Sequence, residues 1–163
     1  MKIKILSRAL PFAFLQMLLL ISCSNADSQA KADVSKGIFP QGKQGPATTF
    51  TGKAYAIGLV DSDSIYSTVV GNVYFEAGAR SHWHSHPGGQ ILIITDGVGY
   101  HQIIGQPKQI LHKGDVVKCP PNILHWHGAS PDTGMQQMYI IPNTEKGIVE
   151  WKEAVTDNVY KGN

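Results

Sequence analysis

The sequence of 163 residues has only two cysteines, Cys23 and Cys119, and they lie far apart. A secreted domain that depends on disulfides carries several cysteine pairs, so this chain has no disulfide framework and relies on its core. Its hydrophobic content of 42% and charged content of 16% exclude a disordered chain. The length is enough for one domain that buries its own core.

Charge of either sign is also scarce. The 14 basic and 12 acidic residues nearly balance, and without Lys2, Lys4 and Arg8 of the first segment 11 basic residues face 12 acidic ones. The sequence contains no basic stripe and no interleaving of basic and aromatic residues. Nucleic acid is therefore excluded as a partner.

The chain lacks an apolar run long enough to span a membrane comfortably. Residues 1–22 join a short cationic start, MKIKILSR, to the apolar run ALPFAFLQMLLLIS, which is typical of an export signal. The run ends in LISC, which resembles the lipobox of bacterial lipoproteins, where the cysteine matching Cys23 is lipidated. This resemblance implies a membrane-anchored protein of the cell envelope, facing the periplasm or held in the outer membrane. In this interpretation residues 23–40 would form a flexible tether between the anchor and the folded domain. The alternative is cleavage after Ser24 or Ala26, which would give a soluble periplasmic or secreted protein.

Helical periodicity is missing between residues 50 and 145. Short segments rich in Val, Ile, Tyr and Thr alternate there with Gly, Pro, Asp and Asn, which predicts many short antiparallel strands. The pair Asp96–Gly97, between two apolar runs, predicts a β-hairpin. We therefore expect an all-β fold over residues 41–145, either a sandwich or a small barrel of the jelly-roll type.

The C-terminal region, residues 146–163, predicts one more strand and a short helix. The segment GIVEWKEAV could close its own barrel or pair with a second copy of the chain. Residues 156–161 favour a turn or two of helix with Thr156 or Asp157 as the N-cap.

All seven histidines lie between residues 82 and 127. In GARSHWHSHPGGQ the residues His82, His84 and His86 alternate, so on a strand they share one face, and Trp83 and Ser85 share the other. The Pro-Gly-Gly sequence that follows favours a tight turn, with positive φ at the residue after the proline, and the chain would fold back antiparallel.

Gln90 follows this turn, and the segment NILHWHG places His125 and His127 on one strand face. Two histidines of the first segment, the oxygen of Gln90 and one histidine of the second can then meet inside a barrel. Three imidazoles and one oxygen are a ligand set for a divalent transition metal with open coordination positions.

These two segments resemble the paired motifs of the cupins, G-x5-H-x-H-x3/4-E-x6-G and G-x5-P-x-G-x2-H-x3-N. Asn122 and Ala129 stand where the second motif has Gly and Asn, and Asn tolerates the left-handed turn that the Gly supplies. The resemblance covers about residues 50–145 and implies one double-stranded β-helix, the jelly-roll cupin barrel. The matching residues are Gly78, His84, His86, Gln90 and Gly97 in the first motif and Gly114, Pro120 and His125 in the second.

Gln90 replaces the usual glutamate, so a bound divalent ion keeps a charge of +2 rather than +1. This favours polarisation of a substrate oxygen or binding of an anion over oxygen-dependent redox chemistry. The segments also look like the manganese cupins that include bacterial hydroxynitrile lyases. That likeness implies His84, His86, Gln90 and His125 as metal ligands and His127 as a catalytic acid/base.

In the lyases a histidine stands where this chain has Gln137, which argues against the same activity. Manganese is the ion that the resemblance implies, with iron, nickel or zinc as alternatives. A metal-dependent lyase acting on a small organic molecule is the first hypothesis for function. A cupin dioxygenase and a non-catalytic envelope protein that binds a ligand or metal are the others, and family cupins often form homodimers.

The remaining candidates have simpler interpretations. His82 fits a pocket rim or a solvated strand end equally well. Surface or strand-pairing positions are expected for His101 and His112, and Cys119 is expected to be a buried structural thiol. Packing between sheets or subunits is expected for Trp83 and Trp126, and Val73, Ile91, Ile93 and Met138 are candidates for the cavity wall.

Overall fold

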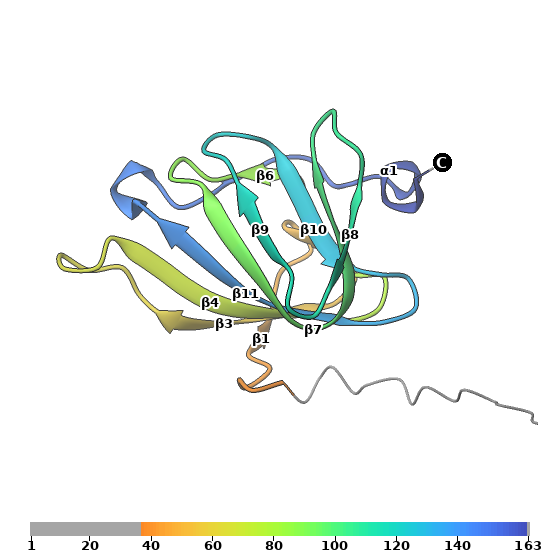
Figure 1. Cartoon of the computed structure of the whole chain (residues 1–163), viewed down its shortest axis with the longest axis horizontal. Coiled ribbons are helices and arrows are strands. Elements are labelled where there is room, and N and C mark those ends of the chain that lie inside the picture. Colours follow the sequence, from red (N-terminus) through yellow and green to blue (C-terminus); the bar gives the residue numbers. More distant parts are fainter. Residues whose placement is uncertain (1–36, 163) are drawn as a thin grey trace, which may run out of the picture. The chain divides into compact units, whose positions relative to one another are not determined.

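The computed structural model describes residues 37–162, which fold into antiparallel strands, one 3-10 turn and one short helix (Figure 1). The all-β prediction is therefore confirmed. The elements are β1 (Lys43–Gln44), β2 (Phe50–Thr51), β3 (Ala54–Val60), β4 (Thr68–Phe75), β5 (Arg80–Ser81), β6 (His84–Ser85), β7 (Gln90–Ile103), β8 (Gln109–His112), β9 (Val116–Cys119), β10 (His125–Ala129), β11 (Met135–Pro142), η1 (Thr144–Lys146), β12 (Glu150–Trp151) and α1 (Asp157–Lys161).

The strands form two layers that share β7. One layer holds β1, β3, β4, β11, β9 and the first part of β7, and the other holds the last part of β7 with β8, β10 and the short strands β2, β5, β6 and β12. Figure 1 shows β4 and β11 curling beneath β10, so that the two layers enclose an interior between them. This curled sheet is the predicted jelly roll.

The predicted hairpin at Asp96–Gly97 is wrong, because β7 runs through this pair without reversing. Its residues 90–93 pair with β9, and residues 98–101 pair with β8. Gly97 has φ 78°, and a Cβ there would lie 2.0 Å from the backbone oxygen of Gly134, so the glycine allows a close approach of two strands. The Asp-Gly pair thus bends a strand from one layer into the other instead of ending it.

Two apolar clusters hold the layers together. The first fills the space between them, and the second lies on the face of β10 away from the histidines, where Trp126 is fully buried against Trp83 and the C-terminal segment. Packing as the role of both tryptophans is confirmed. The first cluster consists of Ala54, Val73, Phe75, Ala79, Leu92, Ile94, Leu111, Val117, Cys119, Ala129 and Met135.

The C-terminal segment runs back across the barrel before it ends in α1. Strand β12 pairs with β6 of the same chain, which agrees with the alternative that this segment closes its own barrel. The Thr156 side chain accepts a hydrogen bond from the Val159 backbone N–H at 3.3 Å, so the predicted helix and its N-cap are confirmed. Arg80 ties the segment down, donating to the Val155 carbonyl at 2.9 Å and to Asp157 at 2.7 Å.

The predicted signal segment, Cys23 and the predicted tether up to residue 36 lie outside the described residues. Within residues 37–162, none of the helices has the length and apolar character needed to cross a membrane.

Candidate metal centre

Three short segments place polar side chains at one end of the interior. His84 on β6 is the cross-strand neighbour of His125 on β10, and their ring centroids are 4.3 Å apart. His86 follows β6, and its ring centroid lies 5.2 Å from that of His84. His84 and His86 share the cavity face as predicted, but the prediction that His82 shares it is wrong, because His82 does not line the cavity.

The turn after His86 brings Gln90 into the same group. The Gly89 N–H donates to the His86 carbonyl at 3.0 Å, which closes a turn with Pro87 at its first central position. The positive φ predicted for Gly88 falls on Gly89, at 81°. The chain does not fold back onto β6 as predicted, because β6 pairs with β10 and β12 while Gln90 begins β7.

Backbone carbonyls fix the orientation of three of the imidazoles. The Nδ1–H groups of His84, His86 and His125 donate to the carbonyls of His82 at 2.9 Å, Ile148 at 2.6 Å and Ile123 at 3.0 Å. A neutral imidazole carries one proton, so each Nε2 is left with a lone pair. Carbonyl partners on the far nitrogen are the usual arrangement around histidines that bind metals through Nε2.

The contact between His125 and Gln90 supports a cation at this point. Nε2 of His125 lies 3.1 Å from Oε1 of Gln90, and both atoms carry lone pairs when Nδ1 holds the proton. Two ligand atoms about 2.1 Å from one ion and at right angles lie roughly 3 Å apart, which this distance matches. The buried Nε2 of His86 has no hydrogen-bond partner, which also fits a ligand.

His127 completes the group from the next inward position of β10. One ring nitrogen each of His84, His125 and His127 lie within 4.8 Å of one another, and these three buried histidines could hold a metal ion. His127 differs from the others on its far side, where Nε2 of Gln137 donates to Nδ1 at 2.9 Å. Its own Nε2 is buried and unpartnered.

Burial keeps these rings neutral, as metal binding requires. It lowers the pKa of His125 from 6.5 to about 3 and, with the neighbouring histidines adding repulsion, lowers the pKa values of His84 and His127 well below 6.5. The pKa of His86 is lowered by the same burial, which its bond to Ile148 partly opposes.

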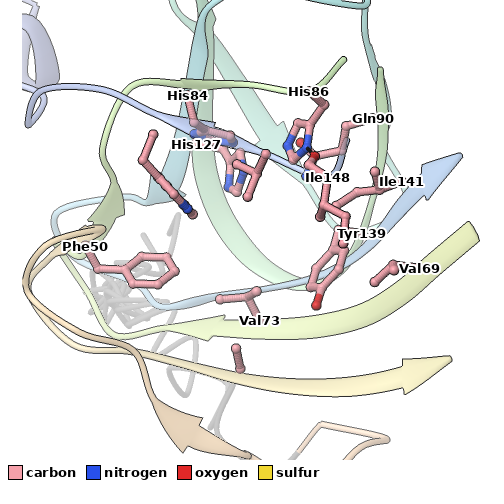
Figure 2. A pocket seen from close by; sticks show the side chains of 13 residues that line it. Phe50, Val69, Val73, His84, His86, Gln90, His127, Tyr139, Ile141 and Ile148 are labelled. Carbon is pink, nitrogen blue, oxygen red and sulfur yellow. Dashed lines mark hydrogen bonds between the residues drawn. The ribbon is translucent and has the colours of Figure 1, made fainter. Parts of the chain in front are cut away.

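The polar group opens onto a cavity of about 220 Å³. Figure 2 shows His84, His86, Gln90 and His127 gathered on one side and Phe50, Val69, Val73 and Tyr139 on the other. His125 is fully buried and does not line the cavity itself. The other lining residues are Ala56, Ile141, Ile148, Val149 and Trp151.

Comparison with known proteins agrees with this geometry. A family model described as the cupin domain matches residues 71–141. An (R)-mandelonitrile lyase from Granulicella tundricola is 41% identical over 118 residues, which span 72% of this chain and 90% of that protein. This chain belongs to the cupin superfamily.

Solved structures place this cupin in the same fold. A cupin-like protein from Thermotoga maritima has 48% identity and a TM-score of 0.75 over 77% of this chain and 95% of that one. A DMSP lyase from Ruegeria pomeroyi has a TM-score of 0.54 over 67% of this chain and 54% of that one, and at 21% identity it shows the shared fold alone.

The sequence did not reveal how much of the cupin's site comes from the C-terminal segment. Ile148 supplies the carbonyl that orients His86, and the Trp151 ring lies over His84 with its centroid 4.8 Å away. Phe50 meets the edge of Trp151 at 5.9 Å, so the two aromatic rings form one wall. The strand pairing between β12 and β6, which joins residues far apart in the chain, brings them together.

Several other expectations have a definite outcome. Val73 lines the cavity as predicted, but Ile91, Ile93 and Met138 do not, because they alternate with the inward residues of their strands. His82 is buried and does not line the cavity, so neither a pocket rim nor a solvated strand end describes it.

The remaining histidines and Cys119 lie behind or outside the site. His112 is exposed as predicted. His101 on β7 is the cross-strand partner of His127 on β10, so the strand-pairing position predicted for it is correct. The alternative of a surface position is wrong, because His101 is buried. Cys119 is the buried thiol expected: its Sγ lies 3.4 Å from Nε2 of His101, and burial raises its pKa to about 12.

Proposed function

We propose that this cupin is a metal-dependent enzyme of the lyase type that acts on a small uncharged organic molecule. The proposed ligands are Nε2 of His84, His86 and His125 with Oε1 of Gln90. The opposed lone pairs of His125 and Gln90, 3.1 Å apart, are the observation that carries the metal site. The proposed metal is a divalent transition ion, manganese first, with iron, nickel and zinc as the alternatives.

When bound, the ion would polarise a hydroxyl or carbonyl oxygen of the substrate. Among residues 37–162, His127 is the other polar side chain on the same side of the cavity, and we assign it as the acid/base that moves the proton of the reacting group. Its buried Nε2 has no hydrogen-bond partner among these residues and is free to meet a substrate atom. The apolar wall opposite would hold the rest of the molecule and exclude water.

The absence of charge in the cavity supports an uncharged substrate. None of its lining residues among residues 37–162 is a lysine, arginine, aspartate or glutamate. The proposed ion would be the one charge that meets a carboxylate or phosphate there, and no charged side chain of the cavity wall would replace the hydration that the rest of such a substrate loses. The (R)-mandelonitrile lyase that is 41% identical makes an aromatic hydroxynitrile the first substrate to try, although Gln137 stands where the lyases have a histidine.

The test is reconstitution of the metal-free protein with manganese, iron, nickel or zinc, followed by parallel assays of mandelonitrile cleavage and oxygen uptake. Cleavage without oxygen uptake is expected. Oxygen uptake instead would identify a dioxygenase, and stoichiometric metal without turnover across a broad substrate screen would identify a binding protein. His127→Ala should abolish cleavage while metal is retained, whereas His112→Ala, at an exposed position, should leave both unchanged.

We further propose that residues 1–22 are removed on export and that Cys23 carries the lipid that anchors the protein in the envelope. Labelled palmitate should enter the full chain but not a Cys23→Ser variant, and a labelled variant would contradict the anchor. A homodimer also stays a prediction, which sedimentation of the mature protein would test.

A further inference from the structure

Gln137 lies on the inner face of β11, directly behind His127 as seen from the cavity. It is fully buried, with its backbone in register with Val73 on β4 and Ile94 on β7. Its side-chain Nε2 donates to Nδ1 of His127 at 2.9 Å, and its Oε1 has no partner. Among the histidines of the site, only His127 has an amide nitrogen in place of a carbonyl oxygen on its far side.

The orientation of the Gln137 amide follows from counting buried polar groups. As placed, the amide donates one N–H to His127, while its oxygen and its second N–H make no hydrogen bond within residues 37–162. Turned by half a rotation, the oxygen would accept from His127, but the –NH₂ group with its two N–H donors would then lack a partner. Buried donors without partners are rarer than underused carbonyl oxygens, so the orientation with Nε2 toward His127 is the more stable one.

This hydrogen bond determines which ring nitrogen of His127 carries the proton. A nitrogen that accepts a hydrogen bond holds the lone pair, so the single proton of the neutral ring lies on Nε2. We propose that Gln137 fixes His127 in the Nε2–H tautomer, so that it faces the cavity as a hydrogen-bond donor and does not act as a metal ligand.

The proposal separates the four histidines by what lies behind them. In His84, His86 and His125 the Nδ1–H donates to a carbonyl oxygen, so Nε2 carries a lone pair that can bind the metal. In His127 the Nδ1 accepts from the Gln137 amide, so Nε2 carries the proton. The ring nitrogens of His84, His125 and His127 lie within 4.8 Å of one another, yet those of His84 and His125 are proposed metal ligands and that of His127 is a hydrogen-bond donor.

For catalysis, the inference rests on the proposed function and narrows it. A neutral ring with Nε2–H stabilises negative charge on a substrate atom by hydrogen bonding, and it is not a base in this state. The role proposed for His127 therefore narrows from moving the substrate's proton to stabilising the charge that forms when that proton leaves. The substrate must then present an acceptor beside the metal, such as a carbonyl or hydroxyl oxygen or a nitrile nitrogen. Gln137 is a positioning residue, since it acts only through His127.

The test is long-range ¹H–¹⁵N NMR of the imidazole nitrogens, first on the metal-free protein and then on the zinc-loaded protein. His127 should show a protonated Nε2 and an unprotonated Nδ1 in both samples. Proton on Nδ1 in the metal-free protein, or loss of the Nε2 proton on zinc binding, would overturn the proposal. This measurement uses the unmodified chain and needs no variant to fold.

Gln137→Met removes the hydrogen bond at similar size and should give a mixture of tautomers or the reverse one. The matched control is Gln102→Met, which loses a bond to Trp126 Nε1 on the far face of β10 and should leave His127 unchanged. An unaltered His127 spectrum in Gln137→Met, or the same shift in both variants, would show that Gln137 does not select the tautomer. A protein with the expected spectrum but no turnover would disprove the proposed function and leave this inference standing.

Discussion

Nε2 of His125 lies 3.1 Å from Oε1 of Gln90 while its Nδ1 donates to the carbonyl of Ile123. The ring thus has an oxygen acceptor on both sides but only one proton to give. A second proton is opposed by burial, which lowers the pKa of His125 to about 3. A metal ion between the two residues resolves this conflict, and so would a half rotation of the Gln90 amide that turns its –NH₂ group toward His125. The first prediction concerns that contact.

Replacing Gln90 with glutamate should tighten metal binding by at least about tenfold, since a carboxylate adds a full negative charge beside the ion. The ion's charge would be partly neutralised, so polarisation of substrate and the rate of cleavage should fall. Competition with a chromophoric chelator measures the affinity. Gln106→Glu is the control, because it adds the same charge at an exposed position away from the site. An equal gain in metal affinity in this variant would show that the effect comes from net charge alone.

The second prediction tests the ligands. His86→Ala should reduce bound metal to less than about a tenth of one ion per chain, because one of four donors is lost from the centre. His112→Ala is the control, because this histidine is exposed and does not belong to the group of histidines at the site. Elemental analysis after loading with one equivalent provides the measurement. Full retention of metal in His86→Ala, with loss in His127→Ala, would assign the ion to the group of His84, His125 and His127 instead.

The third prediction concerns acid. The pKa values of His84, His86, His101, His125 and His127 are all lowered in the fold, chiefly by burial. Below about pH 6.5 the unfolded chain therefore binds protons that the folded chain does not, so the free energy of unfolding falls as pH falls.

Each fully buried ring can contribute up to about 1.4 kcal/mol per pH unit in this range. Urea midpoints of the metal-free protein should drop between pH 7.5 and pH 5. A midpoint independent of pH would contradict neutral burial of these rings.

The fourth prediction concerns alkali. Burial raises the pKa of the Cys119 thiol from 9.0 to about 12, so the folded state holds a proton that the unfolded chain releases above pH 9. Stability should therefore fall between pH 9 and pH 12, by up to roughly 1.4 kcal/mol per pH unit from this group.

Cys119→Ala should lack that part of the slope, which urea unfolding at a series of pH values will show. Iodoacetamide at pH 8 should also leave Cys119 unmodified in the native protein, as measured by mass spectrometry of its peptide. Rapid alkylation of Cys119 while the protein remains folded would show that the thiol is accessible and contradict its burial.

Local pattern was enough to predict the strands around the site. Alternating histidines defined the inward face of β6 and β10, and Thr156 defined the start of α1. Asn122 has φ 61°, so the left-handed turn expected from the departure in the second motif is confirmed. These features depend on a few neighbouring residues and on the period of a strand.

Features that depend on distant pairing could not be predicted in this way. Asp96–Gly97 has the local chemistry of a hairpin, but the residues on its two sides pair with β9 and β8 instead of with each other. The role of Gln137 follows from its side chain on β11 reaching His127 on β10, a strand with which β11 does not pair. The role of Ile148 follows from the C-terminal segment lying beside β6, and no local pattern encodes either arrangement.

The carbonyl of Ile148 and the ring of Trp151 belong to the C-terminal segment, at and just before β12, yet they orient and cover histidines near the middle of the sequence. The proposed site is therefore complete only once β12 has paired with β6. A partly folded form that lacks this pairing would leave His86 without its orienting carbonyl and His84 uncovered, and it would hold an ion more weakly.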